Sequence, residues 1–166
     1  RLKKGRRMEE LEQFALNDSM TGMYNRNAYD YFVKNEKDFE GYVIVTFDLN
    51  NLKQCNDQYG HRAGDEYIIN AARIIEDNFE RYGKCYRIGG DEFCCIIPKG
   101  RYFKIERVMH KIDQDVEILN HKNIIPVPVG IAYGHAVFTA DDTDPEKVRE
   151  RADKDMYRNK KTMKQS

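Results

Sequence analysis

The sequence lacks the features that would place it in several large classes of protein. No apolar run approaches the ~20 residues of a membrane-spanning helix, and the mean hydropathy is −0.81, so the composition excludes a membrane-spanning chain. Neither sign of charge is in excess, because 28 basic residues balance 28 acidic ones, and this argues against broad electrostatic capture of a nucleic-acid polymer. The basic start runs into M-E-E-L-E-Q-F rather than an apolar segment, so we expect no secretory signal peptide.

Cysteine is also scarce, and its spacing suits neither a metal site nor a disulfide framework. The four cysteines stand at positions 55, 85, 94 and 95 and form no C-x-x-C pair. Structural zinc sites and disulfide-stapled domains depend on such regular spacings. We therefore expect four free thiols in a reducing compartment.

The apolar content is sufficient for one folded domain. Hydrophobic residues make up 40% and aromatic residues 11% of the 166 residues, which excludes a disordered chain. Residues 1–17 differ from the rest, because they form a polar segment with a thin apolar stripe that predicts a connecting or stalk helix. Since the chain opens on Arg rather than Met, we expect it to be part of a longer protein.

Hydrophobic periodicity predicts alternating strands and helices in the remainder of the chain. β-Rich runs predict strands over residues 42–48, 84–88, 93–97 and 126–138. Apolar residues at helical spacing predict helices from residue 25, from Gly64 to residue 79, over 102–119 and from Asp144 onward, and residues 51–59 are expected to be irregular or a short helical turn. From residue 42 this order is the split βαβ pattern. The predicted fold class is therefore α+β, with a ferredoxin-like βαββαβ core and extra N- and C-terminal helices.

The connection rules bring two acidic segments of this predicted core together. The first two strands are joined by a helix and are expected to run parallel. The Gly-Gly turn after the second strand then lies at the same edge of the sheet as the carboxyl end of the first. We therefore expect Asp48 and Asn50 to lie near Asp91 and Glu92.

The residues expected at this edge suit metal-assisted phosphoryl transfer. Asp48, Asp91 and Glu92 are hard carboxylate ligands of the kind that bind Mg²⁺ together with substrate phosphates. Gly89 and Gly90 would let a ligand approach the backbone. Further polar residues that suit phosphate or base recognition follow the first strand, namely Lys53, Asn56, Asp57, His61 and Asp65. Each of these residues has an ordinary structural role when taken alone, so the prediction depends on their occurring together.

Four segments match the motifs of one known family. Residues 87–93 read R-I-G-G-D-E-F, and residues 18–26 read D-S-M-T-G-M-Y-N-R, which is similar to D-x-L-T-G-L-x-N-R. Residues 47–65 are similar to D-x-D-x-F-K-x-x-N-D-x-x-G-H-x-x-G-D, and residues 152–160, A-D-K-D-M-Y-R-N-K, are similar to A-D-x-A-L-Y-x-A-K. These motifs resemble those of the GGDEF domains, the diguanylate cyclases of bacterial signalling. The resemblance covers residues 18–166 and implies a fold of the nucleotidyl cyclase and polymerase palm type.

The resemblance implies a reaction that joins two GTP molecules into cyclic di-GMP with release of two pyrophosphates. Asp91 would be catalytic and help to deprotonate the attacking ribose 3′-hydroxyl. The metal ligands for Mg²⁺ or Mn²⁺ would be Asp48, the backbone carbonyl of Leu49, Asp91 and Glu92. The implied substrate-binding residues are Asn56 and Asp65 at the guanine, Gly89 and Gly90 beside the nucleotide, and Lys53, His61, Lys160 and Lys164 around the triphosphate.

The chain departs from the family pattern at a few positions. Asn50 replaces the second Asp of the first-strand motif, which removes one negative charge and is expected to weaken metal binding without abolishing it. Leu52 replaces a Phe, and Lys164 replaces an Arg, which keeps the charge but loses bidentate phosphate geometry. Glu80 and Gly83 occupy the two positions of the R-x-x-D product-inhibition motif, so we expect no product-inhibition site there.

The same resemblance implies partners and leaves two alternatives. Each domain would hold one GTP, so catalysis would need a homodimer, and the full-length protein would carry an upstream sensor or membrane module with this domain in the cytoplasm. One alternative is a weak or inactive domain that binds GTP as a regulatory module, which Asn50 favours. The other is a purely structural dimerisation domain, which the intact base-recognition residues disfavour.

Overall fold

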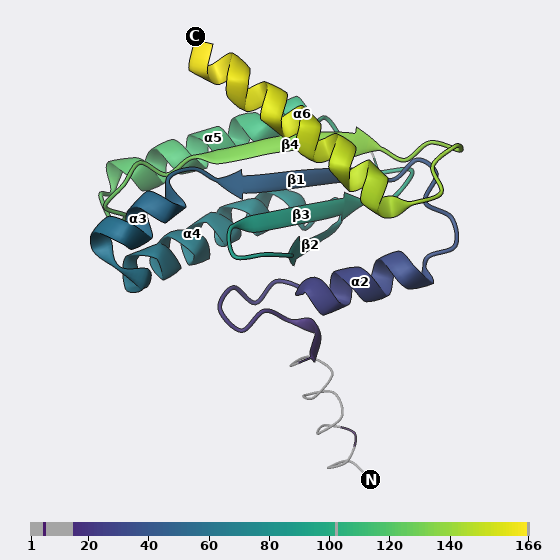
Figure 1. The fold of residues 1–166 in the computed structure, drawn as a ribbon, viewed down its shortest axis with the longest axis horizontal. Coiled ribbons are helices and arrows are strands. Elements are labelled where there is room, and N and C mark those ends of the chain that lie inside the picture. Colours follow the sequence, from purple (N-terminus) through teal and green to yellow (C-terminus); the bar gives the residue numbers. More distant parts are fainter. Residues whose placement is uncertain (1–4, 6–14, 102, 166) are drawn as a thin grey trace.

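The fold is a four-stranded antiparallel sheet with helices on both faces (Figure 1). The computed structural model describes residue 5, residues 15–101 and residues 103–165, with side chains in the last helix up to Asn159, so most of the helix expected over residues 1–17 lies outside the described residues. The strands are β1 (Val43–Leu49), β2 (Lys84–Arg87), β3 (Glu92–Ile97) and β4 (Ile131–Val137). The helices are α2 (Arg26–Asn35), α3 (Leu52–Tyr59), α4 (His61–Phe79), α5 (Ile105–His121) and α6 (Pro145–Gln165).

The strand order confirms the predicted βαββαβ core. The sheet runs β2-β3-β1-β4, and each neighbouring pair is antiparallel. Because β1 and β2 are both antiparallel to β3, they are parallel to each other with β3 between them. This is the split βαβ arrangement, and it places the β2–β3 connection at the carboxyl end of β1.

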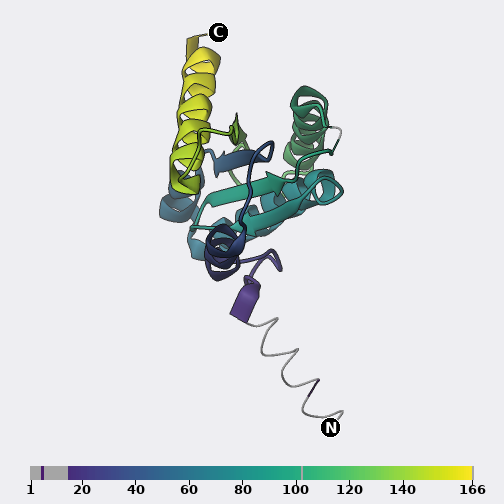
Figure 2. The ribbon, with the colours of Figure 1, turned by 90° about the vertical axis from the view of Figure 1, so that its right-hand side faces the viewer.

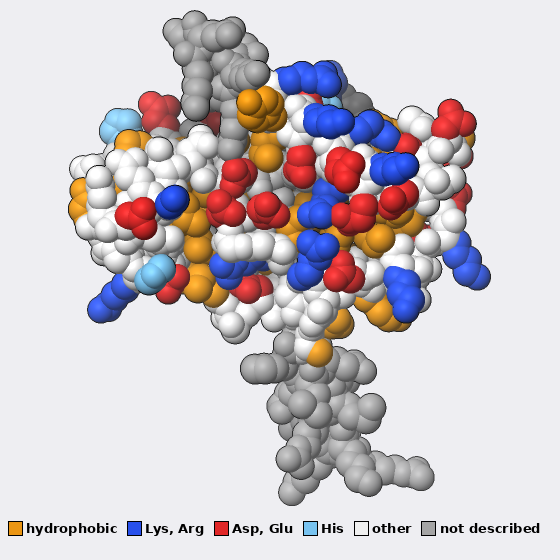
Figure 3. Space-filling view, in the orientation of Figure 1, with side chains coloured by type: hydrophobic (Ala, Val, Ile, Leu, Met, Phe, Trp, Pro, Cys, Tyr) orange, Lys and Arg blue, Asp and Glu red, His pale blue; other side chains and the backbone are white. Residues whose placement is uncertain are grey.

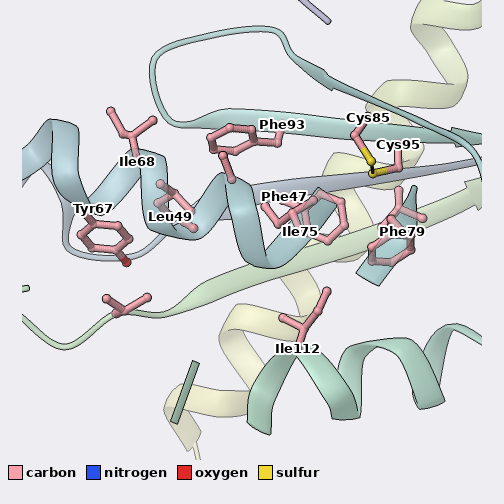
Figure 4. Close-up of a cluster of buried hydrophobic side chains, with 14 of the residues drawn as sticks. Phe47, Leu49, Tyr67, Ile68, Ile75, Phe79, Cys85, Phe93, Cys95 and Ile112 are labelled. Carbon is pink, nitrogen blue, oxygen red and sulfur yellow. Dashed lines mark hydrogen bonds between the residues drawn. The ribbon is translucent and has the colours of Figure 1, made fainter. Parts of the chain in front are cut away.

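Alternation along β1 assigns its side chains to two separate cores. Val45, Phe47 and Leu49 are buried among side chains of α4 and α5, and the close-up in Figure 4 shows Phe47 and Leu49 in this cluster. Ile44 is buried on the opposite face in a cluster with residues of α2 and α6. Figure 2 shows α6 on one side of the sheet and α4 and α5 on the other. Since successive side chains alternate between faces, Asp48 lies on the face that α6 covers.

The helix expected to begin at Gly64 begins three residues earlier, at His61. Gly60 has a φ of 91° and makes the sharp joint between α3 and α4, a conformation that a residue with a Cβ rarely adopts. Gly64 lies inside α4 for a different reason, which is close packing against α3. Among the described residues, no helix is both long enough and apolar enough to cross a membrane.

Candidate functional site

Asp48 and the acidic end of the hairpin meet at one edge of the sheet, as the sequence predicts. Asp48 lies directly opposite Glu92 in the pairing of β1 with β3, and Asp91 immediately precedes β3. Burial raises the pKa of Asp91. The negative charge of Asp48, and a hydrogen bond between the two side chains, raise the pKa of Asp91 further. The two carboxyl groups therefore interact directly. Figure 3 shows acidic side chains gathered on this face, over β1 and β3.

The oxygen atoms at this edge fit a divalent cation. Two carboxylates held together repel each other unless a proton or a cation reduces their charge. The backbone amide of Asn50 donates to the carbonyl of Gly130, the residue before β4, at 2.8 Å. By alternation, the backbone groups of Leu49 are therefore directed to the other side, toward the hairpin. No three His, Cys, Asp or Glu side chains among the described residues are arranged to hold an ion unaided. Mg²⁺ takes one or two protein carboxylates and completes its shell with water and substrate phosphates, so the interacting pair Asp48 and Asp91 is a suitable set of donors.

The two glycines of the hairpin provide space rather than an unusual backbone conformation. Residues 88–91 connect β2 to β3. Neither Gly89 nor Gly90 has a positive φ. A Cβ at Gly90 would meet nothing within 4 Å, whereas one at Gly89 would lie 3.3 Å from the Glu92 side chain. Backbone conformation therefore does not demand glycine at either position, and the space at Gly90 is open.

A half-buried ion pair that the sequence analysis missed joins this hairpin to the N-terminal motif. Arg87 Nη1 donates to both carboxylate oxygens of Asp18, at 3.2 and 3.1 Å, and its Nη2 donates to the Gly90 carbonyl at 3.0 Å. Thr21 donates to the same Asp18 carboxylate through its backbone amide and its hydroxyl. Asp18 begins the motif of residues 18–26, and Arg87 begins the motif of residues 87–93. In the sequence, only their opposite charges could have indicated that they pair.

The expected guanine-binding residues come together where α3 crosses α4. A Cβ at Gly64 would lie 1.7 Å from Asn56 Oδ1, so the Asn56 side chain rests on the backbone of α4 beside Asp65. Lys53, in the first turn of α3, and His61, at the start of α4, are exposed. The structure thus places Asn56 against Gly64, the residue before Asp65, and leaves Lys53 and His61 on the surface of the same helix pair.

Tyr67 connects this helix pair to the carboxylate edge, and it too was missed. Its buried hydroxyl donates to the Asn50 carbonyl at 2.6 Å and accepts from the Gly130 amide at 2.9 Å. A Cβ at Gly130 would lie 2.9 Å from Asn50 Nδ2, so a side chain there would displace the side-chain amide of Asn50. A tyrosine in an amphipathic helix is ordinarily a core residue, so the sequence held no signal for this bond.

Helix α6 adds a carboxylate on the sheet face that carries Asp48. The pKa of Asp153 is raised by its own burial and by the charge of Asp48, although the charge of Arg149 opposes the shift. Lys160 and Lys164 belong to the same helix, but their side chains lie outside the described residues. Their expected place at the triphosphate remains a prediction.

Comparisons with known proteins agree with the motifs. The family model described as "Diguanylate cyclase, GGDEF domain" matches residues 15–166. Diguanylate cyclase DgcS of Shewanella oneidensis is 29% identical over 158 residues, covering 92% of this chain and 52% of the relative. Probable diguanylate cyclase DgcI of Escherichia coli is 28% identical over 145 residues, covering 87% of this chain and 31% of the relative. The chain thus spans about half of the first relative and less than a third of the second.

Solved structures show the same fold. The coiled coil and GGDEF domain of DgcB from Caulobacter crescentus, in complex with c-di-GMP, has a TM-score of 0.79 at 23% identity, covering 96% of this chain and 88% of that one. A microbial GGDEF domain described in an interaction with cyclic di-GMP has a TM-score of 0.63 at 27% identity, covering 89% of this chain and 94% of that one. Taken with the motif order and the acidic edge at the glycine hairpin, these matches show that the chain belongs to the GGDEF domain family of diguanylate cyclases.

Proposed function

We propose that this domain is a diguanylate cyclase that condenses two GTP molecules into cyclic di-GMP and two pyrophosphates. The observation that supports the proposal most directly is the placement of Asp48 beside Asp91 and opposite Glu92 at an open glycine hairpin. The names of the curated relatives support the same activity. In each half-reaction a ribose 3′-hydroxyl attacks the α-phosphate of the other GTP, and pyrophosphate leaves.

The proposed roles follow from the chemistry of the residues at this edge. Asp48, Asp91, Glu92 and the Leu49 carbonyl would hold Mg²⁺ or Mn²⁺, which supplies positive charge to the phosphates when it is bound. Asp91 would accept the proton of the attacking 3′-hydroxyl, the role of a general base. The protein's remaining contribution is positioning and charge neutralisation.

The remaining substrate contacts belong to the α3–α4 pair, the hairpin and α6. Asn56 and Asp65 would recognise guanine, since a carboxylate accepts from the N1–H and the amino group that adenine does not present in that pattern. Gly89 and Gly90 would leave space for the nucleotide. Lys53, His61, Lys160 and Lys164 would lie around the triphosphate.

Each domain would hold one GTP, so the proposed reaction needs two domains facing each other. We further propose that residues 1–17 connect this domain to a sensor or membrane module of the full-length protein, with the catalytic domain in the cytoplasm. In that arrangement the upstream module would control how often two half-sites meet.

A second candidate is a GTP-binding regulatory module with little or no turnover. Asn50 favours it, because an amide replaces a carboxylate of the family motif close to the proposed metal site. Its position is structural as well, since Asn50 is bonded through its backbone to Gly130 and Tyr67. The retained Asp48, Asp91 and Glu92 argue for the enzyme.

The substitution Asp91→Asn tests the enzyme against the regulatory module. The wild-type domain is incubated with GTP and Mg²⁺ at high protein concentration, and the nucleotides are separated by chromatography. We expect cyclic di-GMP from the wild type and at least a ~10²-fold loss of turnover in the variant, with GTP binding retained, because the amide does not accept the proton. A wild-type domain that binds GTP but stays silent, even when its N-terminal segment is fused to a forced dimer, would overturn the cyclase proposal in favour of the regulatory module.

A further inference from the structure

Strand β4 is an edge strand, and every second residue of it directs its backbone groups away from the sheet. The Gly130 carbonyl accepts from the Asn50 amide, and the Phe138 amide donates to the Tyr42 carbonyl, so the even-numbered positions pair with β1. Tyr133, His135 and Val137 therefore point their backbone groups to the open edge. Such free edges invite pairing with another chain and are usually covered.

Three side chains of α6 bind these outward groups in register. Arg151 Nη2 donates to the Val137 carbonyl at 2.9 Å, and Asn159 Nδ2 donates to the Tyr133 carbonyl at 3.0 Å. Between them, the His135 amide donates to Asp155 Oδ2 at 2.9 Å. Four helical residues advance about 6 Å, and two strand residues advance about 6.8 Å, so the two spacings match over these contacts. We call Arg151, Asp155 and Asn159 the edge ladder.

Gly134 brings the helix backbone onto the strand. A Cβ at this position would lie 2.2 Å from the Ala152 carbonyl oxygen and from the Met156 backbone nitrogen. The edge ladder fixes the position of α6 along β4, and the close approach at Gly134 fixes its distance from the strand. Figure 1 shows α6 crossing over β4 in this region.

Two members of the edge ladder are departures of this chain from its family's pattern. The closing motif A-D-x-A-L-Y-x-A-K has Ala at the two positions that Asp155 and Asn159 occupy here. Membership of the family therefore does not imply these bonds, and they need an explanation specific to this chain.

We propose that the edge ladder positions α6 for nucleotide binding, an inference that rests on the proposed function. Helix α6 is antiparallel to β4 and thus runs in the direction of β1, toward the end of the sheet where Asp48 lies. Asp153 stands between the ladder residues Arg151 and Asp155 in sequence, and its carboxyl group is within the electrostatic influence of Asp48. Asn159 fixes the helical turn to which Lys160 belongs. Sliding of α6 along β4 would therefore move Lys160 and Lys164 away from the places proposed for them at the GTP phosphates.

The test is the double substitution Asp155→Ala/Asn159→Ala, which restores the family's residues. Alanine is the best helix former, so the variant is expected to fold, which its melting temperature checks. Hydrogen exchange of the His135 amide should quicken about tenfold, because that amide loses its acceptor. The KM for GTP should rise roughly three- to tenfold with kcat within twofold, because the phosphate contacts are misplaced while the reacting edge is intact.

Two further variants separate positioning from general stability. The single variant Asp155→Asn keeps an acceptor oxygen for the His135 amide, so its KM for GTP should stay at the wild-type value. Glu150→Ala, at an exposed position of the same helix, should change neither KM nor exchange. Faster exchange in the double variant with an unchanged KM would show that the edge ladder is only structural and would overturn the inference. A wild-type domain that neither binds GTP nor forms product would instead remove the proposed function itself, before any variant is compared.

Discussion

Arg87 connects three parts of the chain through one side chain. It reaches Asp18 near the N-terminal motif and the Gly90 carbonyl in the hairpin, and the exposed fractions of the Arg87 and Asp18 side chains are only 14% and 20%. Burial alone raises the pKa of Asp18, but hydrogen bonds from Thr21 and Arg87 outweigh it, and the pKa is lowered. The pair therefore stabilises the fold at neutral pH, and this contribution is lost as the pH falls below the ordinary value of Asp and through the lowered pKa.

The substitution Arg87→Lys should weaken both the fold and turnover. An ammonium keeps the charge but lacks the planar fork that serves Asp18 and Gly90 together. We expect the free energy of unfolding to fall by about 1–2 kcal/mol in urea denaturation at pH 7. We also expect kcat to fall roughly tenfold in the product assay, because the hairpin that carries Asp91 is no longer held.

Arg26→Lys is the matched control for this substitution. Arg26 pairs with Asp30 on an exposed helix surface, where the exposed fractions of the side chains are 46% and 57%. Pairs of this kind contribute about 0.3–0.5 kcal/mol, so stability and kcat should change little. If both lysine variants behaved alike, Arg87 would have no special part in holding the hairpin.

At the scale of elements, the start of β2 is packed too closely to carry the family's product-binding motif. Gly83 follows α4, and a Cβ there would lie 2.1 Å from the Ile96 carbonyl oxygen of β3. Glu80 is the exposed cap of α4. A residue with a side chain at position 83 would therefore require the backbone of β3 to move.

The pair Glu80→Arg/Gly83→Asp, which recreates R-x-x-D, should therefore fail to create product inhibition. The new side chain at residue 83 would force β3 to move, and overpacking of this kind costs about 1–3 kcal/mol, measurable as a lower urea midpoint. Glu80→Arg alone should stay within about 0.5 kcal/mol of the wild type, because that position is exposed. A double variant of wild-type stability that binds cyclic di-GMP in calorimetry would contradict the packing argument.

The elements themselves were largely predictable, whereas several contacts between them were not. Period-two alternation in β1 and the crossover rule were sufficient to place Asp48 beside Glu92, because both are local or topological properties. The start of α4 was misplaced because Gly64 resembles a helix boundary in sequence, although it serves a close approach to Asn56. The bond of Arg87 to Asp18 depends on a tertiary approach of distant segments, which no local pattern encodes.

At the scale of the whole molecule, the described fold gathers the proposed metal ligands at one end of one sheet. Asp48, Asp91 and Glu92 lie at one edge of one sheet. The proposed reaction needs two 3′-hydroxyls, each attacking the phosphate of the other GTP. Because each domain is proposed to hold one GTP, the proposed chemistry makes the encounter of two domains part of the mechanism.

Product formation by this domain should therefore rise more steeply than linearly with protein concentration. Far below the dissociation constant of the dimer the rate should scale with the square of the concentration, because the active species is the pair, and it should become linear once dimers predominate. Initial rates over a hundredfold dilution series at saturating GTP measure this directly. Adding excess Asp91→Asn domain to a fixed amount of wild type should lower the rate, because mixed pairs have one working half-site. A constant rate per molecule across the series would mean that a single domain, or a dimer too tight to dilute, performs the reaction, and size-exclusion chromatography at the same concentrations distinguishes these two.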